Sequence, residues 1–270
     1  MIDHLLQPLV CERFVNDEHY RQGHLRVINA LPARRVLGLH LPEVKQLAKQ
    51  LSREGCEVEL SNGERRVCVD GKGLVRCFEH LSSVRLCYEE TLVWGFLINL
   101  ERCSLAARFA MLESYVPVLD NWAVCDTFCA NAKWMSRADK EQLWDFLQRW
   151  LGSTREFEVR FAVVSAMTCF LCDDWIDRVF EAVDRVDFNR IKSDYISVKG
   201  KAQAAQQGVV QGAEPYYVRM GVAWLLATAL AKFPEHTREY VRRSSLPDDV
   251  IWLYVRKARE SFRTRNVEAM

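Results

Sequence analysis

The sequence has almost no net charge. Its 270 residues include 37 lysines and arginines against 36 aspartates and glutamates, which leaves a formal charge of +1. A chain this close to neutral has no global attraction to nucleic acid or to anionic lipid. Any such partner would therefore need a local basic patch.

The chain also lacks a long apolar run. The longest, "FAVVSAMTCFLC" from Phe161, is too short to span a bilayer. The opening "MIDHLLQPLV" has no basic start followed by an apolar core, which a secretory signal would need. We therefore expect a soluble, cytoplasmic protein with no membrane partner.

A complete set of metal ligands is missing as well. Cys169 and Cys172 have the C-x-x-C spacing of a metal or redox pair, but no second pair or matching histidines would complete four ligands. The ten cysteines are irregularly spaced, and free cytosolic thiols commonly serve as small apolar residues. We expect Cys169 and Cys172, like Cys125 and Cys129, to lie in the core, with no metal or cofactor. If Cys169 and Cys172 were exposed, they would instead favour a thiol-based redox sensor.

Helical signals dominate from about residue 80 onward. Helix starts and stops recur roughly every 20 residues, with few strand signals between them. The predicted starts are Asp120, Ser136 with Asp139, Ser153 with Glu156, Asp174 with Asp177, Pro215 and Pro234. Stacked helical pairs of this length are typical of an α-solenoid, and a compact all-α bundle is the alternative. The length would allow two domains, but the continuous rhythm favours one domain over residues 1–270.

Two segments interrupt the helices. "CEVELSNGERRVCVDGKG", an insertion over about 56–73, alternates apolar and polar residues around Asn62-Gly63 and predicts a small β-hairpin near residues 56–70. The second insertion, over about 193–214, is rich in glycine, glutamine and alanine. We predict a long connection between two helices there, acting either as a lid or as a passive linker.

The stretch "DNWAVCDTFC" places an aromatic ring and a carboxylate one turn apart. Asp120 is a good N-cap, so Trp122 falls in the first turn of the predicted helix. Residues four apart lie on one face of a helix, so Trp122 and Asp126 are neighbours there. An aromatic face beside an anion suits a cation, either a buried arginine or a cationic ligand.

Several segments resemble, in order, the landmarks of one protein family. They are "VLGLHLPEVKQLAKQL", "YEETLVWGFLI", "LDNWAVCDTFC", "FEVRFAVVSAM", "YYVRMGVAWLLATALAKFPE" and "VRKARESFR". From about Val36 to Arg263 the chain resembles the DNA alkylation repair glycosylases of the AlkD-like, HEAT-like-repeat family. The resemblance implies an α-solenoid of HEAT-like helical pairs whose concave groove cradles duplex DNA.

The resemblance also implies an activity. Enzymes of this family release cationic N-alkylated purines, such as 3-methyladenine and 7-methylguanine, from duplex DNA by cutting the N-glycosidic bond, without flipping the base into a pocket and without a metal or cofactor. The expected partner is duplex DNA that contains alkylated bases, and we expect a monomer. The family's catalytic positions fall on Asp126, Trp122, Trp224 and Arg160, with Arg160 expected to clamp a phosphate.

Other interpretations of these residues stay open. Trp224, within "GVAWLLATAL", has the surroundings of an ordinary core tryptophan. Trp122, Asp126, Arg160 and Trp224 could also form a closed structural cluster. The alternative function is a non-catalytic HEAT-like repeat module that binds DNA structures or a protein partner.

DNA binding requires local lysine and arginine, because phosphate neutralisation dominates affinity. The region from Arg219 onward contains more lysines and arginines than aspartates and glutamates. The predicted DNA-binding residues are Arg160, Lys133, Arg219, Arg242, Arg243 and Lys257. The remaining tryptophans are predicted to serve only in packing: Trp94, Trp134, Trp144, Trp150, Trp175 and Trp252.

Overall fold

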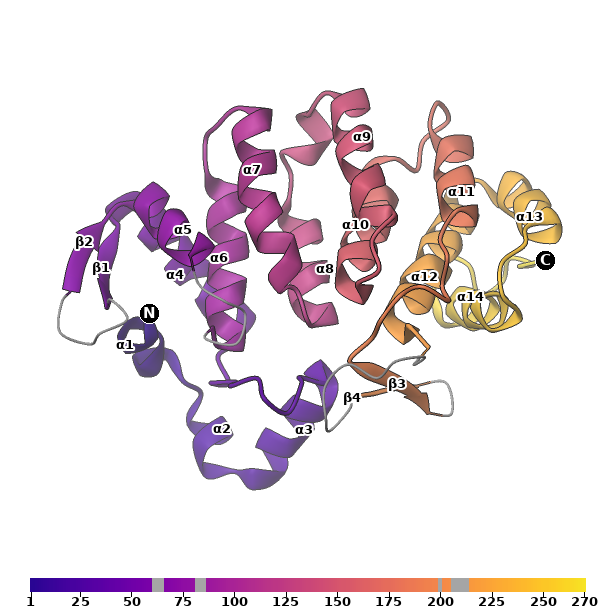
Figure 1. Cartoon of the computed structure of the whole chain (residues 1–270). Helices are drawn as coiled ribbons and strands as arrows, with labels where there is room; N and C mark the ends of the chain where they lie inside the picture. Colours follow the sequence, from indigo (N-terminus) through magenta and orange to yellow (C-terminus); the bar gives the residue numbers. More distant parts are fainter. Residues whose placement is uncertain (60–65, 81–85, 199–200, 205–213) are drawn as a thin grey trace. The chain divides into compact units, whose positions relative to one another are not determined.

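The computed structural model describes residues 1–59, 66–80, 86–198, 201–204 and 214–270. The chain divides into two compact units, Met1–Trp134 (unit 1) and Met135–Met270 (unit 2). The prediction of a single domain over residues 1–270 stays a prediction. The described residues form helices and two small antiparallel hairpins (Figure 1), which confirms the predicted all-α fold of helical pairs. The concave groove stays a prediction.

Unit 1 is built from short N-terminal helices, one hairpin and a stack of longer helices. Its elements are α1 (Asp3–Leu6), η1 (Gln7–Leu9), α2 (Glu12–Asn16), α3 (Glu18–Ile28), α4 (Leu41–Glu54), β1 (Cys56–Glu59), β2 (Arg66–Val69), α5 (Gly71–Glu79), α6 (Tyr88–Leu100), α7 (Leu105–Tyr115), η2 (Val116–Val118) and α8 (Trp122–Asn131). Helix α6 packs against α4, α5, α7 and α8. Figure 1 shows α6, α7 and α8 side by side.

The centre of unit 1 is α6, whose sequence is apolar on all sides except at its two ends. Such a helix is stable only when it is surrounded, and every residue from Tyr88 to Ile98 is buried. The ring of Trp94 lies between Phe78 at 5.6 Å and Tyr115 at 5.2 Å, measured between centroids. Gly95 permits this packing, because a Cβ atom there would lie 2.4 Å from the Tyr115 hydroxyl oxygen.

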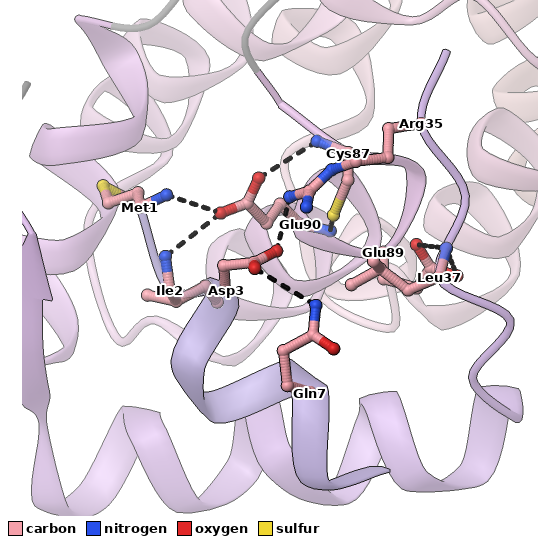
Figure 2. A network of polar contacts seen from close by, with 9 residues as sticks. All are labelled: Met1, Ile2, Asp3, Gln7, Arg35, Leu37, Cys87, Glu89 and Glu90. Atoms are coloured by element: carbon pink, nitrogen blue, oxygen red, sulfur yellow. Dashed lines mark hydrogen bonds and ion pairs between the residues drawn. The ribbon is translucent and has the colours of Figure 1, made fainter. Parts of the chain in front are cut away.

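The start of α6 carries two adjacent carboxylates that are fully buried, Glu89 and Glu90. Glu90 accepts hydrogen bonds from the Cys87 amide at 3.0 Å, the Ile2 amide at 3.0 Å and the Met1 amino group at 2.9 Å (Figure 2). Burial raises the pKa of Glu90, but the Cys87 hydrogen bond and the Met1 amino group together outweigh it, so the pKa lies below its usual value. Glu90 therefore joins the first residues of the chain to α6.

Glu89 holds a second, separate segment. Its carboxylate accepts from the amides of Leu37 and Gly38, at 3.0 and 2.8 Å, and the Leu39 amide lies 3.4 Å away. Gly38 has a φ of +85°, and a Cβ atom there would collide with the Phe14 ring, so only glycine fits this turn. Glu90 thus fixes the first residues of the chain, and Glu89 fixes the segment from Leu37 to Leu39.

Unit 2 repeats the helical-pair arrangement. Its elements are η3 (Met135–Arg137), α9 (Lys140–Leu151), α10 (Glu156–Cys169), α11 (Ile176–Asp184), β3 (Tyr195–Val198), β4 (Lys201–Ala204), α12 (Tyr216–Lys232), α13 (Pro234–Arg243) and α14 (Asp248–Glu260). Helix α12 packs between α10 and α14, and α9 pairs with α10. Phe157, Tyr195 and Tyr217 form a cluster with centroids 4.8 to 5.9 Å apart, which joins α10, β3 and α12.

The hairpins differ from expectation in one place. In the first insertion, β1 pairs with β2 as predicted, and the expected Asn62-Gly63 turn lies outside the described residues. In the second, we expected only a long connection between two helices, but β3 and β4 pair from Tyr195 opposite Ala204 to Val198 opposite Lys201. The first residue of β3, Tyr195, is fully buried and its ring contacts that of Tyr217 of α12. The glycine- and glutamine-rich composition of the segment gave no sign of this contact.

Four predicted helix starts need correction. Helix α8 is capped by Asn121 rather than Asp120, and α9 by Asp139 rather than Ser136. The N-cap positions of α10 and α11 are Arg155 and Trp175, neither of which caps with its side chain. Serine and aspartate are common in turns as well as at caps, so a spacing of three residues locates a helix start only approximately. Helix α13 begins at Pro234, as predicted.

Within the described residues, no helix combines the length and the apolar character that crossing a membrane requires.

Replacing Glu90 by glutamine tests the network at the start of α6. A lowered carboxyl pKa contributes stability at neutral pH that is lost as the pH falls through the folded-state value. We expect Glu90→Gln to lower the free energy of unfolding by about 1–3 kcal/mol at pH 7, and by less at about pH 4. Urea unfolding at both pH values measures this. Glu12→Gln, at an exposed position of α2, should change neither value. An equal loss for Glu90→Gln at both pH values would contradict the assignment.

Candidate functional site

Helix α8 begins at Trp122 because Asn121 caps it. The Asn121 side chain accepts a hydrogen bond from the Ala123 amide at 2.8 Å, and its Nδ2 donates to the Ile28 carbonyl at 2.7 Å. Asp120, predicted as the cap, instead lies 3.6 Å from Nε of Arg34. The buried Asn121 therefore connects the end of α3 to the start of α8. Its cap makes Trp122 the first residue of α8.

Trp122 and Asp126 share the partly exposed face of α8. The opposite face, with Val124, Cys125 and Phe128, is buried in unit 1. The prediction that the indole and the carboxylate lie one turn apart on one face is confirmed. Both residues are partly exposed to solvent. Their chemistry, an anion beside an aromatic face, suits a cationic group.

Arg160 lies on α10 and is only 3% exposed. Its Nη1 donates a hydrogen bond to the Tyr217 carbonyl of α12, and its guanidinium lies 5.7 Å from the centre of the Tyr217 ring. Gly221 lies beside this contact, where a Cβ atom would be 3.4 Å from Nη1. In this geometry the guanidinium holds α10 against α12. Its predicted role as a phosphate clamp stays a prediction.

Glu156 is a second buried charged group on α10, and the sequence pointed to it only as a partner in a capping box. It accepts a hydrogen bond from the Tyr217 amide at 2.6 Å and another from the Ser193 hydroxyl. Burial raises the pKa of Glu156 to about 7, although these hydrogen bonds and Arg160 oppose the change. The carboxylate caps α12, whose own N-cap residue, Pro215, has no polar side chain.

Trp224 lies on α12 and is partly exposed, so it is not fully enclosed in the core. Its side chain borders a cavity of about 440 Å³. The cavity is also lined by Thr228 of α12, Lys257 of α14, and the segment that follows α14. Lys257, predicted to bind DNA, is therefore brought to the same cavity as Trp224.

The other predicted DNA-binding residues lie in different settings. Lys133 is exposed in unit 1, and Arg242 and Arg243 are exposed at the end of α13 in unit 2. Arg219 is paired with Asp249, and a second carboxylate, that of Glu214, lies 3.6 Å away. Arg219 is therefore already neutralised inside unit 2, which argues against its predicted contact with phosphate.

Sequence reasoning missed a cationic surface in unit 1. Lys45, Lys49 and Arg53 recur every four residues along α4 and are all exposed, so they form one stripe. Nζ of Lys45 lies 2.6 Å from Oδ1 of Asn131, at the end of α8. The stripe therefore starts beside the helix that carries Asp126. The spacing within "VKQLAKQLSRE" was the available signal.

The far end of this α4 stripe borders a depression of about 630 Å³. Lys49 and Arg53 line it together with Lys72 of α5 and Arg102, which follows α6. Two carboxylates, from Asp70 and Glu101, also line it, so cations outnumber anions two to one. This is the chemistry of a surface that accepts phosphate groups.

The cysteine predictions had mixed outcomes. Cys125 and Cys129 are buried, as predicted. Helix α10 ends at Cys169, so Cys172 lies beyond it and is exposed, and the prediction that both belong to the core is wrong. Across the part of the chain that the structure describes, no group of three or more histidine, cysteine, aspartate or glutamate residues could hold a metal.

The remaining tryptophans also divide. Trp94, Trp144 and Trp150 are buried, which confirms their predicted packing role. Trp252 is 54% exposed on α14, so the packing prediction is wrong for this residue. It follows two aspartates in the first turn of α14, where the helical periodicity turns it away from the buried Val250 and Leu253.

Comparison with protein families supports the resemblance found in the sequence. Residues 85–186 match the family model described as DNA alkylation repair enzyme. The matched segment contains Trp122, Asp126 and Arg160, whereas Trp224 lies beyond it. The match confirms the predicted resemblance over this segment and supports a role in DNA alkylation repair. Neither the curated proteins nor the solved structures gave a match.

Replacing Glu156 by glutamine tests the buried cap of α12. A carboxyl pKa raised to about 7 contributes stability below its unfolded value, and this stability is lost as the pH rises through 7. Between about pH 4 and 8, the wild type should lose about 3 kcal/mol of unfolding free energy relative to Glu156→Gln. Urea unfolding across this range measures the difference. Glu239→Gln, at an exposed position of α13, should follow the wild type. A parallel pH dependence of Glu156→Gln and wild type would refute the raised pKa.

Proposed function

We propose that the protein is a monofunctional DNA glycosylase that excises cationic N-alkylated purines, such as 3-methyladenine and 7-methylguanine, from duplex DNA. The observation that carries the proposal is the pair formed by Trp122 and Asp126. They lie one turn apart on the accessible face of α8, within the segment that matches the DNA alkylation repair enzyme family.

The chemistry explains why a carboxylate is the group required. A purine alkylated on a ring nitrogen already carries positive charge, so it can leave as a neutral molecule without being protonated. The barrier then lies at the sugar, where oxocarbenium character develops in the transition state. A fixed carboxylate beside that carbon stabilises the growing charge and orients the attacking water. We assign this role to Asp126.

The aromatic rings supply recognition of the cationic base. An indole face attracts a cation by about 0.5–2 kcal/mol, depending on how much water is excluded. Trp122 offers such a face beside Asp126. Trp224 lies in the other unit, at a cavity of its own, and its predicted place in the catalytic site stays a prediction. This attraction favours a cationic base over a neutral one, but it is too small to supply the rate enhancement alone.

Arg160 supports the proposed site indirectly. Its hydrogen bond to the Tyr217 carbonyl and its burial suit a positioning residue that holds α12, the helix carrying Trp224. A direct phosphate contact would require the guanidinium to leave Tyr217.

The burial of Arg160 also favours the second candidate function, a non-catalytic helical-repeat module that binds DNA structures or a protein partner. Such a module needs no phosphate clamp and no carboxylate at the lesion. Its cationic surfaces would hold DNA, and base release would be absent. The two functions therefore separate in one excision assay.

The Asp126→Asn variant tests the assigned chemistry, because it keeps the shape of the side chain and removes its charge. We expect wild-type protein to release 7-methylguanine from methylated duplex DNA, and Asp126→Asn to release it on the order of 100-fold more slowly. Binding of the variant to DNA should be retained. Asp173→Asn, at an exposed position in unit 2, is the matched control and should keep full activity.

Three results decide between the proposals. Comparable release by wild type and Asp126→Asn would remove the role of the carboxylate. Release by neither protein, with DNA binding intact, would favour the non-catalytic module. Loss of binding as well as release in Asp126→Asn would place the residue in recognition rather than in chemistry.

The cationic surface of unit 1 predicts a salt dependence. Each phosphate neutralised on duplex DNA contributes about −0.9 to the slope of log K against log salt concentration. We expect the double variant Lys49→Gln/Arg53→Gln to weaken DNA binding and to reduce this slope by roughly 2. Arg26→Gln, at an exposed position of α3, removes a single charge outside this surface and is the control, which should leave the slope unchanged. Titrations at several salt concentrations measure it, and an unchanged slope in the double variant would exclude this surface from the interface.

A further inference from the structure

The cavity beside Trp224 has a second aromatic side chain on its rim. Phe262, which follows α14, lines the same cavity and is 82% exposed. No other large hydrophobic side chain in the described part of the chain is as exposed. A single exposed aromatic side chain is common on protein surfaces. Phe262 is a candidate for ligand binding because it lies at the rim of a cavity that a second aromatic residue, Trp224, also lines.

Phe262 is held in place by an anchored turn. Thr264, two residues later, is 1% exposed, and its hydroxyl donates to the Ala258 carbonyl at 2.8 Å. The Thr264 and Arg265 amides donate back to the Ser261 carbonyl at 3.1 and 2.8 Å. The ring is therefore presented by a fixed turn, and little conformational entropy is lost when a ligand stacks on it.

The rim of the cavity is cationic. Lys257 and Arg263 line it, and the Arg265 guanidinium lies 4.8 Å from the centre of the Phe262 ring. The one carboxylate on the rim, from Glu260, is occupied by Arg256 at 2.9 Å and by Lys257 at 3.3 Å. The site therefore offers aromatic faces and positive charge, with its only negative group already paired.

We propose that this cavity binds an unstacked nucleotide of a DNA strand. The base stacks on Phe262 beside Trp224, and the phosphate contacts Arg263. Aromatic rings with neighbouring cations are the means by which many proteins hold unpaired bases. A volume of about 440 Å³ suits a ligand of this size.

This inference rests on the proposed DNA-directed function and adds a separate task to it. Because Glu260 is already paired, the cavity offers no carboxylate for chemistry at the sugar, so it binds a nucleotide without cleaving it. Phe262 and Arg263 also lie outside the segment that matches the family model. The site thus gives the protein a preference for DNA in which one nucleotide is out of the stack.

The test compares two DNA probes, a fully paired duplex and the same duplex with one unpaired 2-aminopurine, whose fluorescence reports stacking. We expect the wild type to bind the second duplex more tightly and to change its fluorescence. Phe262→Ala should weaken that binding about tenfold and abolish the fluorescence change, and should leave affinity for the paired duplex unaltered. Arg263→Gln should weaken binding to the unpaired probe and reduce its salt slope by about 1.

Trp252→Ala is the matched control, because Trp252 is also an exposed aromatic residue in unit 2 with an arginine, Arg256, 5.5 Å from its ring. It borders a different cavity and should leave both probes unaffected. Equal binding of the two probes by wild type, or an equal loss for both in Phe262→Ala, would overturn the proposal. The midpoint of thermal unfolding is the control for folding: Phe262→Ala should unfold at the same temperature as the wild type.

Release of 7-methylguanine, measured in parallel, separates this inference from the proposed function. Release without discrimination between the probes overturns the cavity assignment alone. Discrimination without release supports the cavity and overturns the glycosylase proposal.

Discussion

The structure depends on one constraint, which is that the amide groups at a buried helix start must find an acceptor. Helices α6 and α12 are apolar on nearly every side and therefore begin inside their units. Water cannot reach the first amide groups there to accept their hydrogen bonds. Glu90 supplies the acceptor for the turn that starts α6, and Glu156 reaches from α10 to supply it for α12. A carboxylate in an apolar interior is unfavourable alone. Hydrogen bonds and the positive end of a helix outweigh the desolvation of Glu90, whose pKa is lowered, but only partly oppose that of Glu156, whose pKa is raised to about 7.

This constraint positions the candidate site in unit 2. Glu156 and Arg160, one turn apart on α10, bind the amide and the carbonyl of the same residue, Tyr217, from two directions. Trp224 follows Tyr217 by about two turns of a helix, roughly 10 Å along its axis. Fixing the start of α12 therefore fixes where Trp224 meets its cavity. The buried pair contributes to the site through helix placement, a role that the residue types alone do not reveal.

The sequence predicts the helices better than the charged groups between them. Apolar periodicity identified the long helices, and the i, i+4 relation placed Trp122 and Asp126 on one face, because both depend only on local geometry. The β3–β4 hairpin was missed because its burial depends on Tyr195 meeting α12, a contact between distant segments. Arg160 matched a functional position by type, but its burial against Tyr217 is a tertiary property. Local patterns carry no information about which partner a buried charge will find.

The near-zero net charge does not weigh against a DNA partner, because charges act over a limited range. At physiological salt the screening length is about 8 Å, so acidic residues farther away than this barely reduce the potential at a given surface. The α4 stripe in unit 1 and the cavity rim in unit 2 are local concentrations of cations, and in each the nearest carboxylates are few or already paired. A chain that is neutral in sum can therefore hold phosphate groups at defined places while it avoids broad, unspecific attraction to polyanions. Segregated charge of this kind favours recognition of one local DNA geometry over binding along any duplex.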